Sequence, residues 1–397
     1  MRIAIITSGI LPVPAVLGGA VENLIDNYLE YNSIHKIHDI TIYSVYNKRI
    51  KSIKKTSSDV NHYIYIHTES YFYRISRKLY SLFHHDEVYN YYIEYFFEQS
   101  YKLMSEHEYD LIILENRPGF SLKLSQRTNI PLVSHIHFDV LSSPNWDSIS
   151  KCLNGIICVS NYLHNKATKD IQNKCITVHN GINLSLFKKI NKADRLLTRK
   201  SLNISDNDIV LVYCGRIDPI KGVKELIEAI IMLKENRLKL LIIGGSNYGD
   251  QNIENEYIIA VKKLLRSIND QTIFTGYQPY SEIPRLLSAA DIAVIPSLCD
   301  DAFPTTVLEA MATGLPIIAS NRGGIPEQVD ERNAILINTD ENMVKNLALS
   351  INTLIKDKSL RTKMGEASQQ KSHQYGKELY AENFFKAINA LIKYNGK

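Results

Sequence analysis

The chain has 397 residues, of which 45% are hydrophobic and 22% are charged. This length exceeds what one hydrophobic core usually organises, so two domains are expected, and the composition is that of a globular protein rather than a disordered or fibrous one. With 46 basic and 42 acidic residues, the net charge of +4 is too balanced to predict nucleic-acid binding.

The sequence carries no signal for secretion or for a membrane span. No stretch approaches the length of about 18 uninterrupted apolar residues that a spanning helix needs. The apolar N-terminus breaks at Ser8-Gly9 and Pro12, so it is interpreted as a first strand rather than a signal peptide. The five cysteines include no C-x-x-C pair, which is typical of reduced thiols in a cytoplasmic protein.

Short β-branched and apolar runs alternate with helical patterns along the whole chain. The runs predict strands at Ile3–Thr7, Ile40–Val45, Tyr63–His67, Leu111–Leu114, Leu132–Ile136, Ile156–Val159, Ile209–Tyr213, Leu238–Ile243, Thr272–Phe274, Ile292–Ile295, Pro316–Ala319 and Ala334–Ile337. Helical patterns such as Val223–Leu233 and Val307–Thr313 separate them. This βαβ rhythm occurs twice and predicts an α/β protein with two doubly wound, Rossmann-like domains.

The polar segment Asn183–Ser205 contains no clear strand and is interpreted as the seam between the domains. We therefore expect an N-terminal domain over residues 1–185 and a C-terminal domain over residues 186–376. Residues 377–397 are expected to cross back as an amphipathic helix, because five apolar side chains fall on or near one stripe. These are Phe384, Phe385, Ile388, Leu391 and Ile392. Doubly wound domains bind ligands at the carboxyl ends of their strands, so motifs directly after strands are the candidate sites.

The first such motif is a glycine pair, Gly18-Gly19, after the first predicted strand and at the start of a helix. Glycines there let a phosphate or a substrate approach backbone N–H groups closely. A plain structural turn explains the pair equally well.

A second motif, Ser134–Asp139, ends the strand at Leu132–Ile136. Alternation places His135 and His137 on one face, and His137 lies nearer the strand end and the expected crevice. An H-x-H spacing also occurs in metal sites, but no further His or Cys cluster accompanies it, so no metal is expected. A core or loop histidine is the other alternative.

A third motif, Cys214–Gly222, follows a strand and opens a helix. Gly215 permits close approach of the backbone to a ligand. The planar guanidinium of Arg216 and the ammonium of Lys221 could each bind one of two phosphates. The alternative is a strand-to-helix turn with solvated cations. The motif is not G-x-G-x-x-G, so a nicotinamide site is not supported.

The most informative stretch is Asp301–Glu327. It contains a helix start at Phe303-Pro304-Thr305-Thr306, with proline early and threonine as the cap. Glu309 on the next turn could accept both hydroxyls of a ribose, and Asp301 could accept sugar hydroxyls or stabilise positive charge. The alternative is that Asp301 caps the helix and Glu309 pairs with a surface base. However, apolar neighbours surround Glu309, and a half-buried acid needs a partner.

In this order and at these intervals, the segments resemble the retaining glycosyltransferases of family four, which have the GT-B architecture. The resemblance covers most of the C-terminal half and several points of the N-terminal half. The positions that match the motifs of the family are Gly18, Gly19, His137, Asn180, Gly181, Arg216, Lys221, Asp301, Glu309, Ala310, Met311, Ala312, Gly314, Pro316, Gly323, Gly324 and Glu327. Asp301 stands where the family usually has Glu, and Phe303-Pro304 replaces Phe-Gly, which removes one N–H donor.

The resemblance implies an acceptor-binding and a donor-binding domain facing across a cleft. It implies metal-independent transfer of a hexose or N-acetylhexosamine from a nucleoside diphosphate sugar, more often of uridine than of guanosine. The acceptor would be a glycan or a lipid-linked glycan in bacterial surface polysaccharide biosynthesis. The implied catalytic residues are His137, Asp301, Arg216 and Lys221, and the implied donor-binding residues are Gly18, Gly19, Gly215, Arg216, Lys221, Phe303, Pro304, Thr305, Thr306 and Glu309.

Ten of the 24 tyrosines lie between Tyr63 and Tyr101, together with Arg74, Arg77 and Lys78. An aromatic core explains this cluster, and so does a surface that meets a glycan or a lipid headgroup. The second interpretation predicts peripheral contact of a cytoplasmic protein with the inner membrane leaflet.

Three rival functions are compatible with parts of the sequence. A nucleotide-sugar epimerase shares the two-domain plan, but it needs paired acids and bases in the N-terminal half, where the sequence shows none. A silent nucleotide- or glycan-binding partner subunit is the second alternative, because Asp301 departs from the usual Glu. A nicotinamide oxidoreductase is disfavoured by the missing glycine fingerprint.

Overall fold

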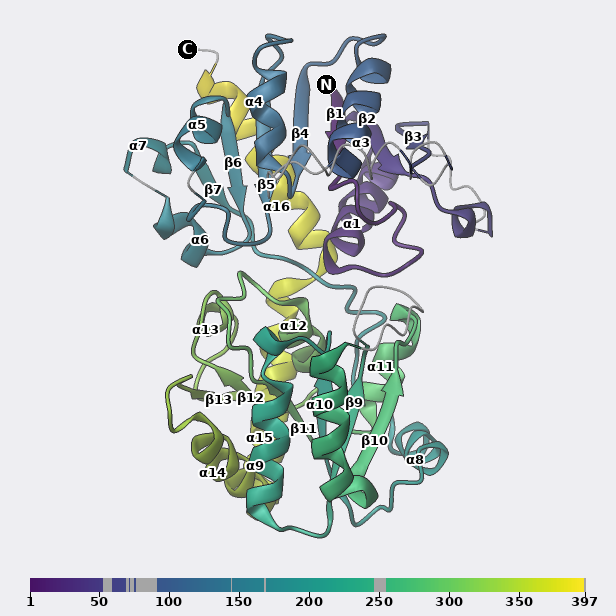
Figure 1. Ribbon diagram of the computed structural model, residues 1–397, viewed down its shortest axis with the longest axis vertical. Coiled ribbons are helices and arrows are strands. Elements are labelled where there is room, and N and C mark those ends of the chain that lie inside the picture. The colour runs from purple at the N-terminus through teal and green to yellow at the C-terminus, as the bar shows by residue number, and fades with distance from the viewer. Residues whose placement is uncertain are drawn as a thin grey trace. The chain divides into compact units, whose positions relative to one another are not determined.

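The computed structural model describes residues 1–52, 59–68, 71, 75, 91–143, 145–167, 169–245 and 255–395 of the chain (Figure 1). Contacts divide the chain into two compact units. Met1–His179 together with Tyr380–Lys397 form the N-terminal unit, and Asn180–Leu379 form the C-terminal unit. The last segment of the chain therefore rejoins the unit formed by the first.

In the N-terminal unit, the strands form one parallel sheet in the order β3-β2-β1-β4-β5-β6-β7. The strands are β1 (Arg2–Ile6), β2 (Asp39–Val45), β3 (Asn61–Ile66), β4 (Leu111–Glu115), β5 (Leu132–Ile136), β6 (Gly155–Cys158) and β7 (Cys175–Thr177). The central strands β1, β4 and β5 are buried along almost their whole length because both faces of a doubly wound sheet are covered by helices.

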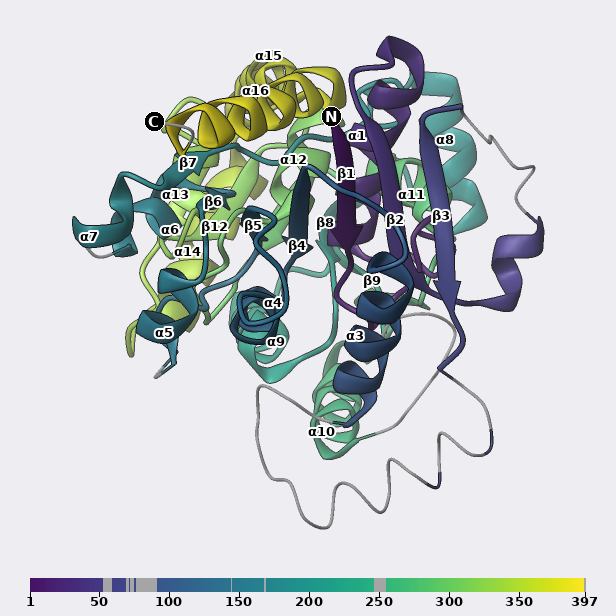
Figure 2. The same cartoon turned by 90° about the horizontal axis from the view of Figure 1, so that it is seen from above.

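Helices cover both faces of this sheet (Figure 2). They are α1 (Ala20–His35), α3 (Tyr91–Met104), α4 (Ser121–Leu124), α5 (Trp146–Lys151), α6 (Asn161–Lys166), α7 (Lys169–Gln172) and α16 (Lys377–Asn395), with short 3-10 turns η1 (Lys48–Ser52) and η2 (Pro118–Phe120). α1 and α16 share one face, where Tyr28 stacks on Phe384 with ring centroids 4.2 Å apart. A Cβ on Gly155 of β6 would lie 2.7 Å from Leu391, so α16 packs directly on the sheet.

In the C-terminal unit, the strands form a second parallel sheet in the order β10-β9-β8-β11-β12-β13. They are β8 (Ile209–Cys214), β9 (Leu238–Ile243), β10 (Thr272–Gly276), β11 (Ile292–Ile295), β12 (Ile317–Ser320) and β13 (Ala334–Ile337). The helices are α8 (Lys192–Ser201), α9 (Val223–Leu233), α10 (Glu256–Leu265), α11 (Ile283–Ser288), α12 (Thr305–Ala312), α13 (Ile325–Gln328), α14 (Met343–Lys356) and α15 (Lys358–Ser372). Short 3-10 turns are η3 (Pro219–Lys221), η4 (Arg266–Gln271), η5 (Tyr280–Glu282) and η6 (His373–Tyr375).

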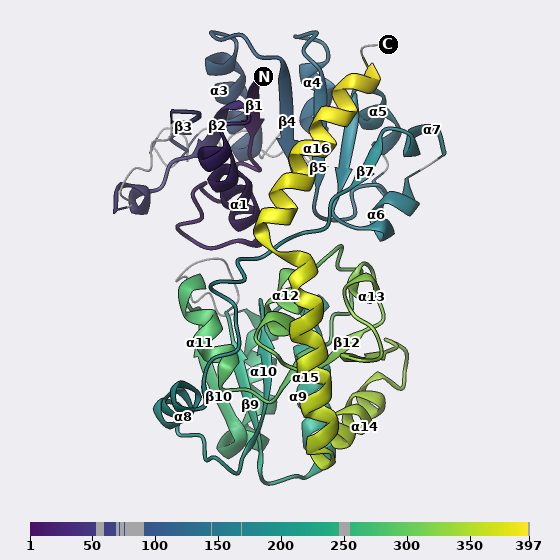
Figure 3. The ribbon, with the colours of Figure 1, turned by 180° about the vertical axis from the view of Figure 1, so that it is seen from behind.

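The helices of the C-terminal unit also form two layers. α9, α10 and α14 bury one apolar face against the sheet, and α12 packs against α15 on the other side, as the view from behind shows (Figure 3). This division follows from right-handed crossovers that run outward in both directions from the first strand of the sheet.

Each sheet has one point at which the strand order reverses. It lies between β1 and β4 in the N-terminal unit and between β8 and β11 in the C-terminal unit. Ligands of doubly wound sheets bind at such switch points, outside the carboxyl ends of the strands. The loops that follow these strands therefore hold the candidate site.

The predicted α/β architecture of two Rossmann-like sheets is confirmed, and each predicted strand overlaps an observed one. The sequence prediction missed β7, which is only three residues long. It also placed a threonine as the cap of α12, and this is wrong because Pro304 is the N-cap and Thr305 is the first helical residue.

Arg74, Arg77 and Lys78 lie outside the described residues. Among the helices that are described, none is both long and apolar enough to cross a membrane.

Candidate functional site

The loop after β8 carries Gly215 and Arg216 and is held by the end of β9. The N–H of Gly215 donates to the carbonyl of Ile243 at 2.9 Å, and the Tyr213 hydroxyl donates to the carbonyl of Arg216. The guanidinium of Arg216 lies 3.6 Å from the carboxylate of Asp218, and its side chain is 38% exposed. The backbone of this loop is fixed, whereas the cationic end of Arg216 remains accessible to a ligand.

Lys221 ends η3, and a close backbone contact brings it to the next loop. A Cβ on Gly222 would lie 1.9 Å from the carbonyl oxygen of Pro296, and Gly222 has a φ of +70°. The N–H of Leu298 donates to the carbonyl of Ile220 at 2.8 Å. Only glycine fits at position 222, so this residue sets the approach of the loop after β8 to the loop after β11.

The result is a cluster of Lys221 and Asp301 with two smaller side chains. The ammonium of Lys221 pairs with Oδ1 of Asp301, and the hydroxyl of Ser297 donates to Oδ2. The thiol of Cys299 lies 3.6 Å from Oδ1 of Asp301, and burial together with the Asp301 charge raises the pKa of this thiol. The structure thus brings together two of the predicted site residues, Lys221 and Asp301.

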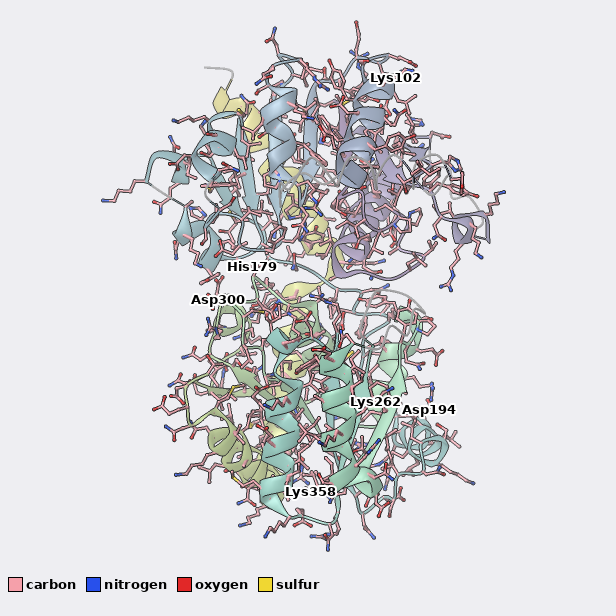
Figure 4. The ribbon with its side chains drawn as sticks, in the orientation of Figure 1. Lys102, His179, Asp194, Lys262, Asp300 and Lys358 are labelled. Atoms are coloured by element: carbon pink, nitrogen blue, oxygen red, sulfur yellow. The ribbon has the colours of Figure 1, made fainter. Side chains whose placement is uncertain are left out.

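The backbone of Asp301 is held by the double glycine that follows β12. The N–H of Gly324 donates to the carbonyl of Asp301 at 2.8 Å, and a Cβ on Gly323 would lie 2.2 Å from the same oxygen. Arg322 pairs with Asp300 at 2.9 Å. In Figure 4 Asp300 lies at the opposite end of the C-terminal unit from Lys358. The double glycine therefore supports the loop that carries Asp301.

The start of α12 is anchored by two side-chain amides. The side-chain amide of Asn180 donates to the carbonyl of Phe303 at 2.8 Å, and that of Gln328 donates to the carbonyl of Pro304 at 2.9 Å. The ring of Phe303 is buried against Tyr375. Phe303 could thus meet a ligand only through its backbone. The first N–H groups of α12, beginning at Thr305 and Thr306, have no intrahelical partner and suit an anion.

Glu309 lies on the second turn of α12 and is only 4% exposed. The hydroxyl of Tyr280 donates to Oε1 of Glu309 at 3.3 Å, and the hydroxyl of Thr305 is a second partner. Burial raises the pKa of Glu309 to about 7, although both hydroxyls act to lower it. A buried carboxyl with few donors gains from further hydroxyl donors, and a bound ribose would supply two.

In the N-terminal unit, Gly18 and Gly19 form the entry to α1, with φ of +75° and +105°. Gly19 is the N-cap, and a Cβ there would lie 2.1 Å from Oε2 of Glu22. Burial raises the pKa of Glu22 to about 7. The glycine therefore makes room for a carboxyl group that folds back over the helix start.

His137 joins a cluster that the sequence prediction did not contain. Its Nε2 lies 3.1 Å from Oε2 of Glu115, while Nδ1 of His135 lies 3.2 Å from Oε1. The hydroxyl of Tyr28 donates to Oε1 at 2.9 Å. Glu115 ends β4 and is fully buried. These contacts satisfy both carboxylate oxygens.

Glu115, His135 and His137 also have the composition of a metal site, with their ligand atoms within 4.8 Å of one another. The separations of 3.1 and 3.2 Å are hydrogen-bond lengths, and Tyr28 uses a further lone pair of the carboxylate. The arrangement is therefore a hydrogen-bonded cluster. It also overturns the expectation that the N-terminal half lacks closely placed acids and bases.

Sequence reasoning missed Glu115, Ser297 and Tyr280. Glu115 directly follows the predicted strand Leu111–Leu114, and Ser297 stands two residues after the strand at Ile292–Ile295. A systematic search for polar residues at strand ends would have found these two. Tyr280 has no such signal, because it reaches Glu309 from a separate turn, η5.

Comparisons with known proteins show what this chain is similar to. Residues 194–371 match the family model described as glycosyl transferases group 1. The chain is 28% identical over 405 residues to the spore coat protein SA of Bacillus subtilis, covering 96% of this chain and 98% of that protein. It is 30% identical over 226 residues to a lipopolysaccharide 1,2-N-acetylglucosaminetransferase of Salmonella typhimurium, covering 56% and 57% of the two chains.

Residues 194–371 of the chain form a group 1 glycosyltransferase domain. The fold of the chain is that of GT-B glycosyltransferases: Anabaena HepE, solved in complex with UDP-glucose, superposes with a TM-score of 0.73 at 19% identity, covering 98% of this chain and 100% of that chain. This glycosyltransferase transfers a sugar from a nucleotide sugar. The match to the group 1 model disfavours the epimerase and oxidoreductase alternatives.

Proposed function

We propose that this glycosyltransferase moves a hexose or N-acetylhexosamine from a UDP-sugar, with retention of anomeric configuration, to a glycan or lipid-linked acceptor. Bacterial surface polysaccharide biosynthesis is the proposed pathway class. The observation that carries the proposal is the Lys221–Asp301 pair at the switch point of the C-terminal sheet, with Glu309 on the second turn of the adjoining helix.

The C-terminal unit would bind the nucleotide. Arg216, Lys221 and the N-terminus of α12 are suited to the diphosphate, because two cations and oriented N–H groups can neutralise a leaving group without a metal. Glu309 would accept both ribose hydroxyls. HepE, which has the same fold, was solved with UDP-glucose, and this favours uridine as the base.

Asp301 would act beside the sugar. The carboxylate of Asp301 is shared between Lys221 and Ser297. When a diphosphate draws the ammonium of Lys221 toward itself, the carboxylate becomes available to sugar hydroxyls or to positive charge near the anomeric carbon. The β-phosphate would take the proton of the acceptor hydroxyl, so that attack and departure occur on one face and configuration is retained.

The N-terminal unit would bind the acceptor, and His137 would contact the transferred sugar. The similarity to a lipopolysaccharide N-acetylglucosaminetransferase supports a surface glycan as the acceptor class.

Peripheral membrane contact through Arg74, Arg77 and Lys78 stays a prediction. It fails if replacing all three by Ala leaves binding to anionic vesicles unchanged.

The decisive experiment is release of nucleoside diphosphate from a panel of UDP-, GDP- and ADP-sugars. We expect slow release from one UDP-sugar, lost in Arg216→Ala and Glu309→Ala. Arg237→Ala is the matched control, because Arg237 is 70% exposed and directly precedes β9, away from the carboxyl ends of the strands. No release from any donor, with no binding of UDP, would instead favour the silent partner subunit.

A further inference from the structure

In the cluster around Glu115, two imidazole nitrogens are buried and, within the described part of the chain, have no hydrogen-bond partner. They are Nε2 of His135 and Nδ1 of His137. The side chain of His137 is 6% exposed. Buried polar atoms nearly always have a partner, so the orphan nitrogen of His137 marks a place that a ligand group would satisfy.

The hydrogen bonds to Glu115 determine which nitrogen of His137 carries the proton. Burial acts to raise the pKa of Glu115, but the charge and hydrogen bonds of His135 and His137 lower it to about 2. An ionised carboxylate only accepts hydrogen bonds, so Nε2 of His137 must donate. Burial and the proximity of His135 lower the pKa of His137 to about 4. At neutral pH the ring therefore carries one proton, at Nε2, and Nδ1 is an acceptor.

The surroundings of Glu115 hold its carboxylate in one orientation. Oε1 accepts from both Tyr28 and His135, which leaves Oε2 for His137. Glu115 and His135 are register partners on the neighbouring strands β4 and β5. Phe384 stacks on Tyr28 and lies 5.2 Å from the His135 ring. Tyr28 and His135, the two partners of Oε1, are thus themselves fixed by the core.

We propose that Glu115 is a positioning residue that holds His137 in the Nε2–H tautomer, so that Nδ1 accepts a hydrogen bond from a hydroxyl of the bound sugar. A carboxylate that orients a histidine in this way also sets the tautomer at many metal and catalytic sites. The inference rests on the proposed function, because it assigns the ligand of His137 to the donor sugar.

The test is Glu115→Gln in the full chain. The glutamine oxygen can replace Oε1 and keep the bonds from Tyr28 and His135, while its NH₂ group replaces Oε2 and donates to Nε2. The proton of His137 then moves to Nδ1, which can no longer accept. We expect kcat/KM for the UDP-sugar to fall at least tenfold, while the Kd for UDP, which lacks the sugar, changes less than twofold. Glu94→Gln, on α3 in the same unit, is the matched control and should stay within twofold.

The tautomer is measured directly from the ring ¹⁵N shifts of histidine-labelled protein, with His137→Asn to assign the signal. We expect a protonated Nε2 in the parent chain and a protonated Nδ1 in Glu115→Gln. A protonated Nδ1 in the parent chain would overturn the proposal even if the variant failed to fold. So would a His137 signal that a chelator shifts, or an undiminished kcat/KM in Glu115→Gln. The ¹⁵N spectrum does not depend on catalytic turnover. Failure of the proposed function would therefore be recognised separately, because the parent chain would then release no UDP.

Discussion

The carbonyl oxygen of Asp301 lies where a side chain on Gly323 would have to stand, 2.2 Å from the Cβ position. The glycine therefore does more than turn the chain after β12. It lets the loop after β11 rest on the loop after β12, so that the carboxylate of Asp301 meets Lys221 and Ser297.

This contact predicts the effect of Gly323→Ala. The new methyl group would clash with backbone and would stand at a φ of +58°, so we expect a loss of roughly 2–4 kcal/mol in the free energy of unfolding and loss of nucleotide release. Urea denaturation measures the first effect. Gly276→Ala is the control: its φ is +67° with nothing within 4 Å, so it should lose only about 1 kcal/mol. Equal losses at the two positions would contradict the clash.

The raised pKa of Glu309 predicts how donor binding depends on pH. With a pKa of about 7, the carboxyl is mostly protonated at pH 6 and mostly ionised at pH 8. Only the ionised form accepts two ribose hydroxyls, so the affinity for UDP-glucose should rise by up to about tenfold across this range. Calorimetric titration measures it, and UDP-glucose is chosen because its phosphates do not titrate there. Glu309→Gln should bind weakly without pH dependence, and a pH-independent parent chain would refute the assignment.

Asp301 is predicted to act through its charge. Asp301→Asn keeps the shape but loses the charge, so we expect kcat to fall by about 100-fold. Asp301→Glu, which restores the acid usual in the family, should retain at least about a tenth of the activity if charge matters more than reach. Asp206→Asn, an exposed aspartate in the same unit, is the matched control. A fully active Asp301→Asn would remove this residue from the mechanism.

The packing of α16 predicts an effect on the stability of the N-terminal unit. Phe384 is fully buried against Tyr28 and His135, so Phe384→Ala should cost roughly 3–5 kcal/mol of unfolding free energy. Asn389→Ala on the exposed side of the same helix should stay within about 0.5 kcal/mol. Denaturant unfolding, followed by circular dichroism, separates the two. If the loss of unfolding free energy in Phe384→Ala were as small as that in Asn389→Ala, α16 would contribute little to the N-terminal core.

Sequence patterns predicted the two sheets well because strands buried on both faces are long apolar runs, as in β1 and β9. They also predicted the helix of residues 377–397, whose apolar stripe is regular. They could not find contacts made across the fold. Glu115 meets His137 over 22 residues and Tyr280 meets Glu309 over 29, and nothing local in the sequence specifies either pair. The cap of α12 was mispredicted because the extended backbone at Pro304 can itself begin a helix, without a side-chain cap.

The return of α16 to the N-terminal unit constrains the order in which the two units can fold during synthesis. The apolar core over β1, β2 and β4 includes Phe384, Ile388 and Leu391 from this helix. A ribosome releases these residues only after it has synthesised all of Asn180–Leu379, the entire C-terminal unit. During translation the C-terminal unit can therefore complete its own core first, while the half that emerged earlier waits with only α1 on the sheet face that α16 will later share.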